Sequence, residues 1–545
     1  MNSVRVLAQN WELILAILLC VSWGTLLIFA FLKKIAGTQF TDAELVALAL
    51  SGWPLPALVI SALVLVLRLF IPASLVLVIA FGLLATSTGF AIRALWKQVS
   101  RDFVIPVFIF LFFVFIRLGF SANAVLPPYF DSAEHYRIIQ SLINIDDVFT
   151  TSYYHIGYHG IFAAFTWLTH ANLGQVILLF GQVILAAIPL PMYFFVHRAT
   201  NSNTAARAAF GVTLAAFGWF MPAHAVNWGK YPALLSLLLI QFVIGAAIIK
   251  NRWLFALSLA AALLIHTRSI ILLAIFAAAW MLSAIPRNKR ILIFVLTGTL
   301  LGMSIMLIDR NQVISPIFEP YANWVTLLVI LLTVSVFQSF PRLIVFSILA
   351  ILLMLAGMFI PVTSALTLLD RPLVEMTLFL PLAFLGGLGA TRLPRPAVII
   401  LAAVIIIHAW TTYSFSPSSC CQLVSRDDAV ALDWMNKQLP TDARIAIAST
   451  DLSLNAFGAP MSGTGTDAGI WVAPLTKHVT FPLPASTDFT TQSTHDLLCQ
   501  QQVTHIYVGS LPRSFNSNFV DARPAWYKTV FILPKARVVQ TLGCE

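Results

Sequence analysis

Long runs of apolar residues, each about as long as a bilayer is thick, dominate the chain up to residue 412. A transmembrane helix needs about 20 predominantly apolar residues, and by that criterion the sequence predicts about 12–14 membrane helices. The predicted segments are 11–32, 50–70, 72–96, 103–121, 174–197, 205–222, 231–249, 253–266, 269–285, 291–308, 323–340, 343–361, 373–390 and 396–412.

The pattern changes at Ser416, where short apolar segments begin to alternate with Pro, Gly, Ser and Asp. Arg426 to Leu439 has the periodicity of an amphipathic helix, and Pro440 ends it. Alternation predicts strands at 443–448, 478–481, 505–508 and 529–533. The predicted fold is therefore mostly α: a polytopic transmembrane helical bundle over residues 1–412, followed by a soluble α/β domain over residues 413–545.

Composition supports a membrane protein. Hydrophobic residues make up 59% of the 545 positions and charged residues 10%, whereas about 25% of a typical soluble domain is charged. The net charge of +10 comes from the first 412 residues, where Lys and Arg are scattered in short loops. Such scattering is typical of cytoplasmic loops that obey the positive-inside rule, and it does not indicate nucleic-acid binding.

The basic residues also predict the orientation of the chain. Alternate loops collect most of them and contain only three acidic residues, so we assign these loops to the cytoplasm. The opposite loops and the C-terminal domain then lie outside the cytoplasm, at a plasma (inner) membrane, and the loop at 122–172 is on that outer face. Disulfides become possible there for Cys420, Cys421, Cys499 and Cys544, with free thiols as the alternative. The cytoplasmic set is Lys33, Lys34, Asp42, Glu44, Arg93, Lys97, Arg101, Asp102, Arg198, Arg207, Lys250, Arg252, Arg287, Lys289, Arg290, Arg342, Arg392 and Arg395.

An acidic segment at 127–142 follows the fourth predicted helix. Asp131, Glu134 and His135 are spaced i, i+3 and i+4, so a helix would place them on one face. A carboxylate there could accept the proton of an attacking hydroxyl, or Asp131 and Glu134 could bind Mg²⁺ or Mn²⁺. The same spacing also fits a capping box at a helix start, so a structural interpretation stands beside the catalytic one.

Aromatic and histidine residues gather at 150–162. His155 and His159 are spaced i, i+4, which on a helix could bind zinc. Gly157 lies between them and no third ligand is evident, so we favour aromatic packing and polar contacts with a substrate. Tyr154, His159 and the neighbouring His135 are the candidate substrate-binding residues.

Cationic residues interrupt the apolar pattern at later outer positions. Lys230 lies at a helix entry beside Trp228, where it could anchor the helix at the membrane interface or bind a lipid-linked phosphate. His266 and Arg268 break the apolar run at 253–285, which we interpret as a re-entrant or broken pair of helices. Arg268 there could clamp a phosphate or simply cap a short helix.

Asp370 and Arg371 mark the entry of the next-to-last predicted helix. The adjacent opposite charges could neutralise each other at the interface. They could also place a second cationic phosphate ligand opposite Arg268. In the C-terminal domain, the stretch 467–479 could line an acceptor site, but we favour a structural turn with a buried Trp471.

The order of these features resembles the C-type (GT-C) glycosyltransferase superfamily. The resemblance covers most of the chain after residue 100: an acidic outer loop, an amphipathic helix, a Lys-Tyr-Pro helix entry, a His-x-Arg break, a late Arg and a soluble outer domain. The stretch 427–446 also looks like the start of the C-terminal domain of bacterial and archaeal members.

The resemblance implies an enzyme that transfers a sugar from a polyprenyl-phosphate carrier to an acceptor hydroxyl on a glycan, lipid or protein. It implies that Asp131 is the base, with Glu134 as the other candidate. Lys230, Arg268 and Arg371 would then stabilise the phosphate leaving group. His135, Tyr154, His159, His266 and Asp370 complete the predicted substrate site.

Two other functions compete with this interpretation. A transporter or lipid flippase would place charges along a path across the membrane, often in broken helices of matched halves. An O-antigen-type polymerase or ligase would also transfer sugars between lipid carriers on the outer face. It would more typically use a large outer loop near the end of the chain than an early acidic loop and a C-terminal domain.

Overall fold

The computed structural model describes residues 2–36, 39–96, 99–144, 156–201, 205–285, 318–362, 367–413 and 415–544, apart from 451–454, 457–458 and 461–463. Within these ranges the chain is mostly helical, with a small C-terminal sheet, as the sequence predicts. The predicted helix at 291–308 and the predicted site residue Tyr154 lie outside the described residues.

Eight helical segments of the described chain are long and apolar enough to cross a membrane, and five further apolar helices are shorter. Each overlaps a predicted membrane helix. The long segments are Trp11–Ala36 (α2), Asp42–Leu67 (α3 and α4), Ala73–Leu95 (α5), Arg101–Ser121 (η1 and α6), Leu173–Thr200 (α9 and α10), Tyr231–Ile249 (α12), Arg371–Arg392 (α19, α20 and η4) and Arg395–Thr412 (α21). The shorter ones are Ala205–Phe217 (α11), Arg252–Ile265 (α13), Ser269–Ser283 (α14), Trp324–Ser335 (α17) and Pro341–Gly357 (α18).

Burial separates the centre of the bundle from its periphery. In the most apolar stretches of α9–α10 and of α19–α20, 94% of the residues are buried, compared with 17% in α5 and in α21. The peripheral helices nevertheless expose apolar side chains such as Val78 and Ile400. Because water would oppose such exposure, these faces fit a lipid environment.

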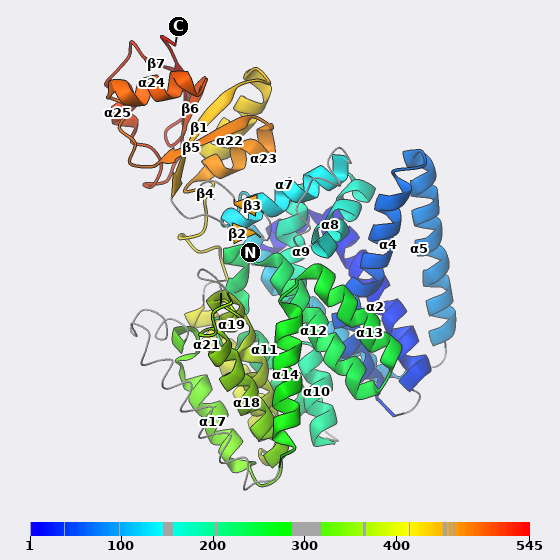
Figure 1. The fold of residues 1–545 in the computed structure, drawn as a ribbon. Coiled ribbons are helices and arrows are strands. Elements are labelled where there is room, and N and C mark those ends of the chain that lie inside the picture. Colours follow the sequence, from blue (N-terminus) through cyan, green and yellow to red (C-terminus); the bar gives the residue numbers. More distant parts are fainter. Residues whose placement is uncertain are drawn as a thin grey trace.

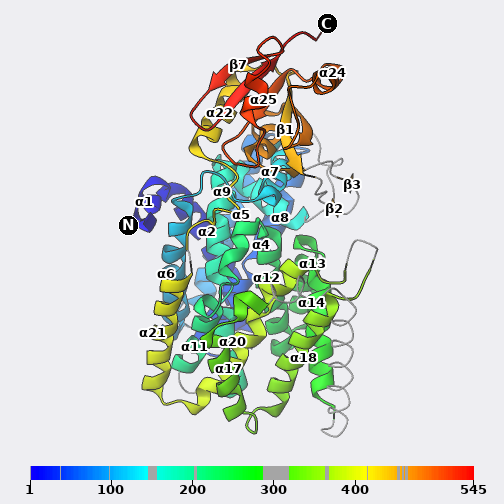
Figure 2. The ribbon, with the colours of Figure 1, turned by 90° about the vertical axis from the view of Figure 1, so that its left-hand side faces the viewer.

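Several short helices cover the end of the bundle that carries the C-terminal domain. α7 (Phe130–Asn144) lies between the bundle and that domain, with α8 (Ile156–Thr169) beside it (Figure 1). α1 (Asn2–Gln9) packs along α6 at the same end (Figure 2). On α7, Ile139 and Leu142 are buried against the bundle core, so this helix is held by its apolar face.

The tail domain (residues 415–544) is built on a six-stranded sheet. β1 (Arg444–Thr450) pairs in parallel with β5 (Val479–Pro484) and β6 (His505–Val508), and the end of β1 pairs antiparallel with β4 (Thr464–Gly465). β8 (Arg537–Thr541) lies antiparallel between β6 and β7 (Tyr527–Ile532). The remaining elements are β2 (Asn455–Ala456), β3 (Ala459–Pro460), α22 (Arg426–Gln438), η5 (Ala468–Trp471), α23 (Val472–Thr476), α24 (Gln492–Gln500) and α25 (Ser517–Asp521).

The predicted helix and the four predicted strands of this domain are confirmed as α22, β1, β5, β6 and β7. β8 was not predicted, because its apolar content is limited to Val538 and Val539, both of which are buried in the sheet. Trp471 is fully buried in the η5 turn, which agrees with the structural interpretation of this segment.

The tail domain and α7 share one hydrophobic core. Ala133 of α7 is buried in the same cluster as Leu432, Met435 and Trp471 of the tail domain. The rings of Tyr136 and Trp471 meet edge to face with centroids 5.6 Å apart. α7 is therefore packed on one side against the bundle and on the other against the tail domain.

Two disulfides occur in the tail domain. Cys499 of α24 is bonded to Cys544 near the end of the chain, and Cys420 is bonded to the adjacent Cys421. Cys20 of α2 is a free thiol. The Cys499–Cys544 bond closes a loop that contains β6, β7 and β8, so it ties the C-terminal end to the sheet.

Replacing both Cys499 and Cys544 by alanine should destabilise the tail domain by about 2–4 kcal/mol, because the crosslink restricts the unfolded chain. Hydrogen exchange of the detergent-solubilised protein, read by mass spectrometry, should become faster in peptides from β7 and β8. Cys20→Ala, which also removes a cysteine, is the matched control and should leave exchange unchanged. Equal protection of β8 with and without the disulfide would contradict the prediction.

Candidate functional site

The start of α7 is set by a tight turn after Pro127 and Pro128. Tyr129 adopts a left-handed conformation with φ 69°, and its backbone N–H donates to the carbonyl oxygen of Cys421 at 2.8 Å. The helix begins at Phe130, so Asp131 lies inside its first turn and does not precede it. The side chain of Asp131 is therefore available for a contact outside the helix.

That contact is an ion pair with Lys230. Asp131 Oδ2 lies 2.5 Å from Lys230 Nζ, and the side chains are 11% and 28% exposed. Gly229, directly before Lys230, has φ 65°, and a Cβ atom there would lie 2.7 Å from Ser132 Oγ. Only glycine fits this close approach with a left-handed backbone, and it brings Lys230 against the start of α7.

Two histidines lie next to the ion pair. His135 Nδ1 is 3.1 Å from Nε2 of His159 on α8, and His135 also hydrogen-bonds to the backbone of Gly229. Burial, followed by the charges of His159, Lys230 and His266, holds the pKa of His135 well below its usual value. His135 is therefore a neutral imidazole at neutral pH and can share a proton with His159.

The turn between α13 and α14 carries the next members of the site. Arg268 Nη1 lies 2.6 Å from Oδ2 of Asp370, the residue that precedes α19. Burial lowers the pKa of His266 to about 4, while Asp370 raises it and Arg268 and Lys230 lower it. His266 therefore lies among the charges of both ion pairs.

These contacts join seven of the predicted site residues into one group, the Asp131 cluster. Its members come from α7, α8, the Lys230 turn, the α13–α14 turn and the start of α19, which are far apart in the sequence. They are Asp131, His135, His159, Lys230, His266, Arg268 and Asp370.

Two of the remaining predicted residues, Glu134 and Arg371, have partners outside the cluster. Glu134 points to Arg137, whose guanidinium donates to both of its carboxylate oxygens at 2.9 and 2.6 Å. Arg371 pairs with the buried Glu375 at 2.5 Å, one turn along α19. Tyr154 lies outside the described residues.

One residue that shapes the site, Gly229, was not singled out in the sequence, although a glycine directly before the Lys-Tyr-Pro helix entry is the available signal. The pairing of Arg371 with the buried Glu375 also has a signal in the sequence. Glu375 follows Arg371 by four residues, and this spacing is typical of an ion pair on one helix face.

The electrostatics of Asp131 suit a proton acceptor. Burial raises the pKa of its carboxyl, Lys230 lowers it, and the neighbouring Asp370 raises it, with a net upward shift. A carboxylate with a raised pKa is a stronger base in its ionised form. The upward shift makes Asp131 a candidate for a general base.

A divalent metal does not fit the two acidic residues expected to hold it. Asp131 is bonded to Lys230 and Glu134 to Arg137, so a cation would have to displace a positive group from each. Within the described residues, the side chains close enough together to ligate a metal are those of His495, Cys499 and Cys544 in the tail domain. Both of these cysteines are in a disulfide. We derive no chemistry through a metal at Asp131.

Comparison with known proteins adds no family. No protein-family model matches the sequence, and no curated protein matches it. The chemistry and the position of the Asp131 cluster therefore have to support any functional assignment.

Replacing Lys230 by methionine should destabilise the protein increasingly as the pH rises. Without Lys230, the pKa of Asp131 rises further, and ionisation above that pKa leaves an uncompensated buried charge that costs about 1–3 kcal/mol. Thermal unfolding of the full chain in detergent, at mildly acidic and mildly alkaline pH, measures the difference.

The double variant Asp131→Asn with Lys230→Met is the control, because it removes both charges and with them the pH dependence of this pair. A loss of stability in Lys230→Met that is the same at both pH values would argue against the ion pair.

Proposed function

We propose that the protein is a membrane glycosyltransferase that moves a sugar from a polyprenyl-phosphate carrier to an acceptor hydroxyl. The observation that carries the proposal is the pairing of the buried Asp131 with Lys230, in one cluster with the second cation Arg268. A base beside two cations is what the transfer of a group from a phosphate requires.

The cluster also lies where such a reaction would take place. α7 is at the end of the bundle, directly beneath the tail domain (Figure 1). A lipid-linked donor has its hydrocarbon in the membrane and its phosphate and sugar at the interface. The end of a helical bundle therefore gives access to the donor from the membrane and to a water-soluble acceptor from the other side.

In the proposed reaction, Asp131 takes the proton of the acceptor hydroxyl as its oxygen forms a bond to the anomeric carbon. The bond from that carbon to the phosphate oxygen breaks at the same time. The electron pair of this bond leaves on the polyprenyl phosphate. The products are the glycosylated acceptor, the lipid phosphate and the protonated carboxyl of Asp131.

Lys230 and Arg268 stabilise the charge that develops on the departing phosphate. In the free protein their charges are compensated by Asp131 and Asp370. A phosphate that binds between them would share these cations, and Lys230 would loosen its hold on Asp131 as the carboxylate takes up the proton. The ion pair thus keeps the base ionised until a substrate arrives.

The distribution of charges favours an orientation with the tail domain outside the cytoplasm of a plasma membrane. The loops expected in the cytoplasm hold most of the Lys and Arg residues, and the loops of the Asp131 cluster belong to the opposite set. The acceptor would then be a glycan, lipid or protein of the cell envelope.

Transport fits the described ion pairs less well. A transporter or flippase needs polar groups that continue through the bundle. Besides the Asp131 cluster, the buried acids in the described membrane part are Asp42 and Glu44, which pair with Lys33 and His197, and Glu375, which pairs with Arg371. Asp42 and Glu44 belong to the loops expected on the cytoplasmic side, whereas Glu375 belongs to the opposite set, as the Asp131 cluster does. An O-antigen-type polymerase or ligase remains the alternative enzyme class.

Asp131→Asn should lower sugar transfer by about 10²–10⁴-fold, because asparagine cannot accept the proton. The measurement is turnover of radiolabelled polyprenyl-phosphate sugars by the purified protein in nanodiscs. In the wild type, turnover should rise with pH through the raised pKa of Asp131, and Lys230→Gln should move this rise to higher pH.

Glu134→Gln is the matched control, since it changes the neighbouring carboxylate that binds Arg137. Full turnover by a folded Asp131→Asn variant would exclude Asp131 as the base, and the absence of turnover with every lipid-phosphate sugar in the wild type would exclude the proposed reaction.

Arg268→Gln should reduce turnover by about 10²–10³-fold, because it removes a cation from the leaving phosphate. Arg371→Gln should reduce it less, because Arg371 is paired with Glu375 outside the cluster. Single-turnover rates of the two variants test this ranking, and a larger loss for Arg371→Gln would reverse the assignment.

A further inference from the structure

A second cation is buried in the bundle away from the Asp131 cluster. Arg117 lies one turn before the end of α6 and is 6% exposed. Its Nε and Nη2 atoms donate to Oε1 of Gln182 at 3.0 and 2.8 Å, and Nη2 also donates to the carbonyl oxygen of Ala223 at 3.4 Å. All of these acceptors are neutral.

The charge of Arg117 is uncompensated within the described residues. Its guanidinium forms no ion pair there, and its other close contacts are the rings of Phe120 and Phe415, at 5.5 and 6.0 Å from the centroids. A charged side chain within a membrane segment is costly and usually serves a function. Arg117 therefore needs an anion that the described chain does not supply.

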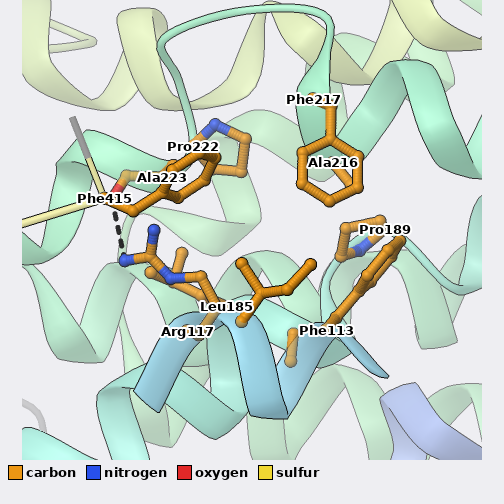
Figure 3. A pocket seen from close by; sticks show the side chains of 11 residues that line it. Phe113, Arg117, Leu185, Pro189, Ala216, Phe217, Pro222, Ala223 and Phe415 are labelled. Atoms are coloured by element: carbon orange, nitrogen blue, oxygen red, sulfur yellow. Dashed lines mark hydrogen bonds between the residues drawn. The ribbon is translucent and has the colours of Figure 1, made fainter. Parts of the chain in front are cut away.

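A hollow opens beside the guanidinium. Figure 3 shows Arg117 facing Ala223 and Phe415, with Phe217 and Pro189 across the space. The empty volume of the hollow, counted with the part open to the surroundings, is ≈ 360 Å³. Apart from Arg117, the side chains that line it are apolar.

Gln182 holds the guanidinium in place beside the hollow. Its Oε1 accepts two hydrogen bonds from Arg117, so Nε2 of the same amide group points away from the guanidinium. Gln182 does not line the hollow, so Arg117 is the group that would meet an oxyanion such as phosphate.

The surroundings of the hollow fit a hydrocarbon chain. Phe112 and Phe115 of α6 are each 44% exposed, and Trp410 of α21 is 64% exposed with its ring against Phe415. These faces are those of peripheral helices and fit lipid. An anion that reaches Arg117 along them would be attached to a hydrocarbon, which points to a lipid phosphate.

We infer that Arg117, held in place by Gln182, forms a second lipid-phosphate site, which binds the phosphate group of a membrane lipid whose hydrocarbon lies along α6 and α21. The site is distinct from the Asp131 cluster, because the contacts of Arg117 are with Gln182, Ala223, Phe120 and Phe415, none of which belongs to that cluster. The inference does not depend on the proposed sugar transfer.

Native mass spectrometry of the full chain in detergent tests the inference. Hexadecyl phosphate is the probe, with hexadecanol and inorganic phosphate as the arms that separate a lipid phosphate from a hydrocarbon or a free anion. The Lys230→Gln variant serves as the background, so that phosphate binding at the Asp131 cluster is weakened. We expect hexadecyl phosphate to bind, and Arg117→Gln to weaken its binding at least about tenfold.

Ala216→Phe is a second test in case Arg117→Gln does not fold. Ala216 lines the hollow, so a phenylalanine there fills the space, keeps Arg117 and should also abolish binding. Arg117→Lys retains the charge but loses the planar fork, and should bind at an intermediate level. Unchanged binding in both Arg117→Gln and Ala216→Phe would overturn the inference, as would equal binding of inorganic phosphate or of hexadecanol.

Discussion

The ion pair between Asp131 and Lys230 determines how the end of the bundle is arranged. It joins residues 99 positions apart, and the glycine before Lys230 lets the loop approach α7 closely enough for the pair to form. Removing two charges from water is costly unless they neutralise each other. The ion pair therefore ties the start of α7, and with it His135, to the loop that leads into α12.

Packing reinforces this electrostatic constraint. Buried residues of α7 belong to the bundle core on one side and to the core of the tail domain on the other. A helix of 15 residues would not be stable alone in water, so both partners are needed to hold it. The carboxylate of Asp131 consequently stands on a helix that is packed on two faces, as the proposed role of proton acceptor requires.

The sequence allowed the membrane segments to be predicted because apolar length is a local property. The same holds for most strands of the tail domain, whereas β8 has too few apolar residues to be detected. The members of the Asp131 cluster could be found as polar residues in apolar surroundings. Their pairing could not be predicted, because Lys230 meets Asp131, and Arg268 meets Asp370, only when helices that are distant in the sequence pack together. Glu134 and Arg371 were expected to act with Asp131, but each pairs with a residue on its own helix. Glu134 binds the guanidinium of Arg137, and Arg371 binds the carboxylate of Glu375.

The shared core of α7 and the tail domain also bears on how the protein is made. A ribosome releases residue 131 long before residue 471, so α7 enters the membrane surface with one of its faces still uncovered. Ala133 and Tyr136 remain without their partners until Trp471 has been synthesised and its domain has folded. The surroundings of the Asp131 cluster are thus completed only after the tail domain has been made, and a chain terminated before Trp471 cannot hold α7 in its final place.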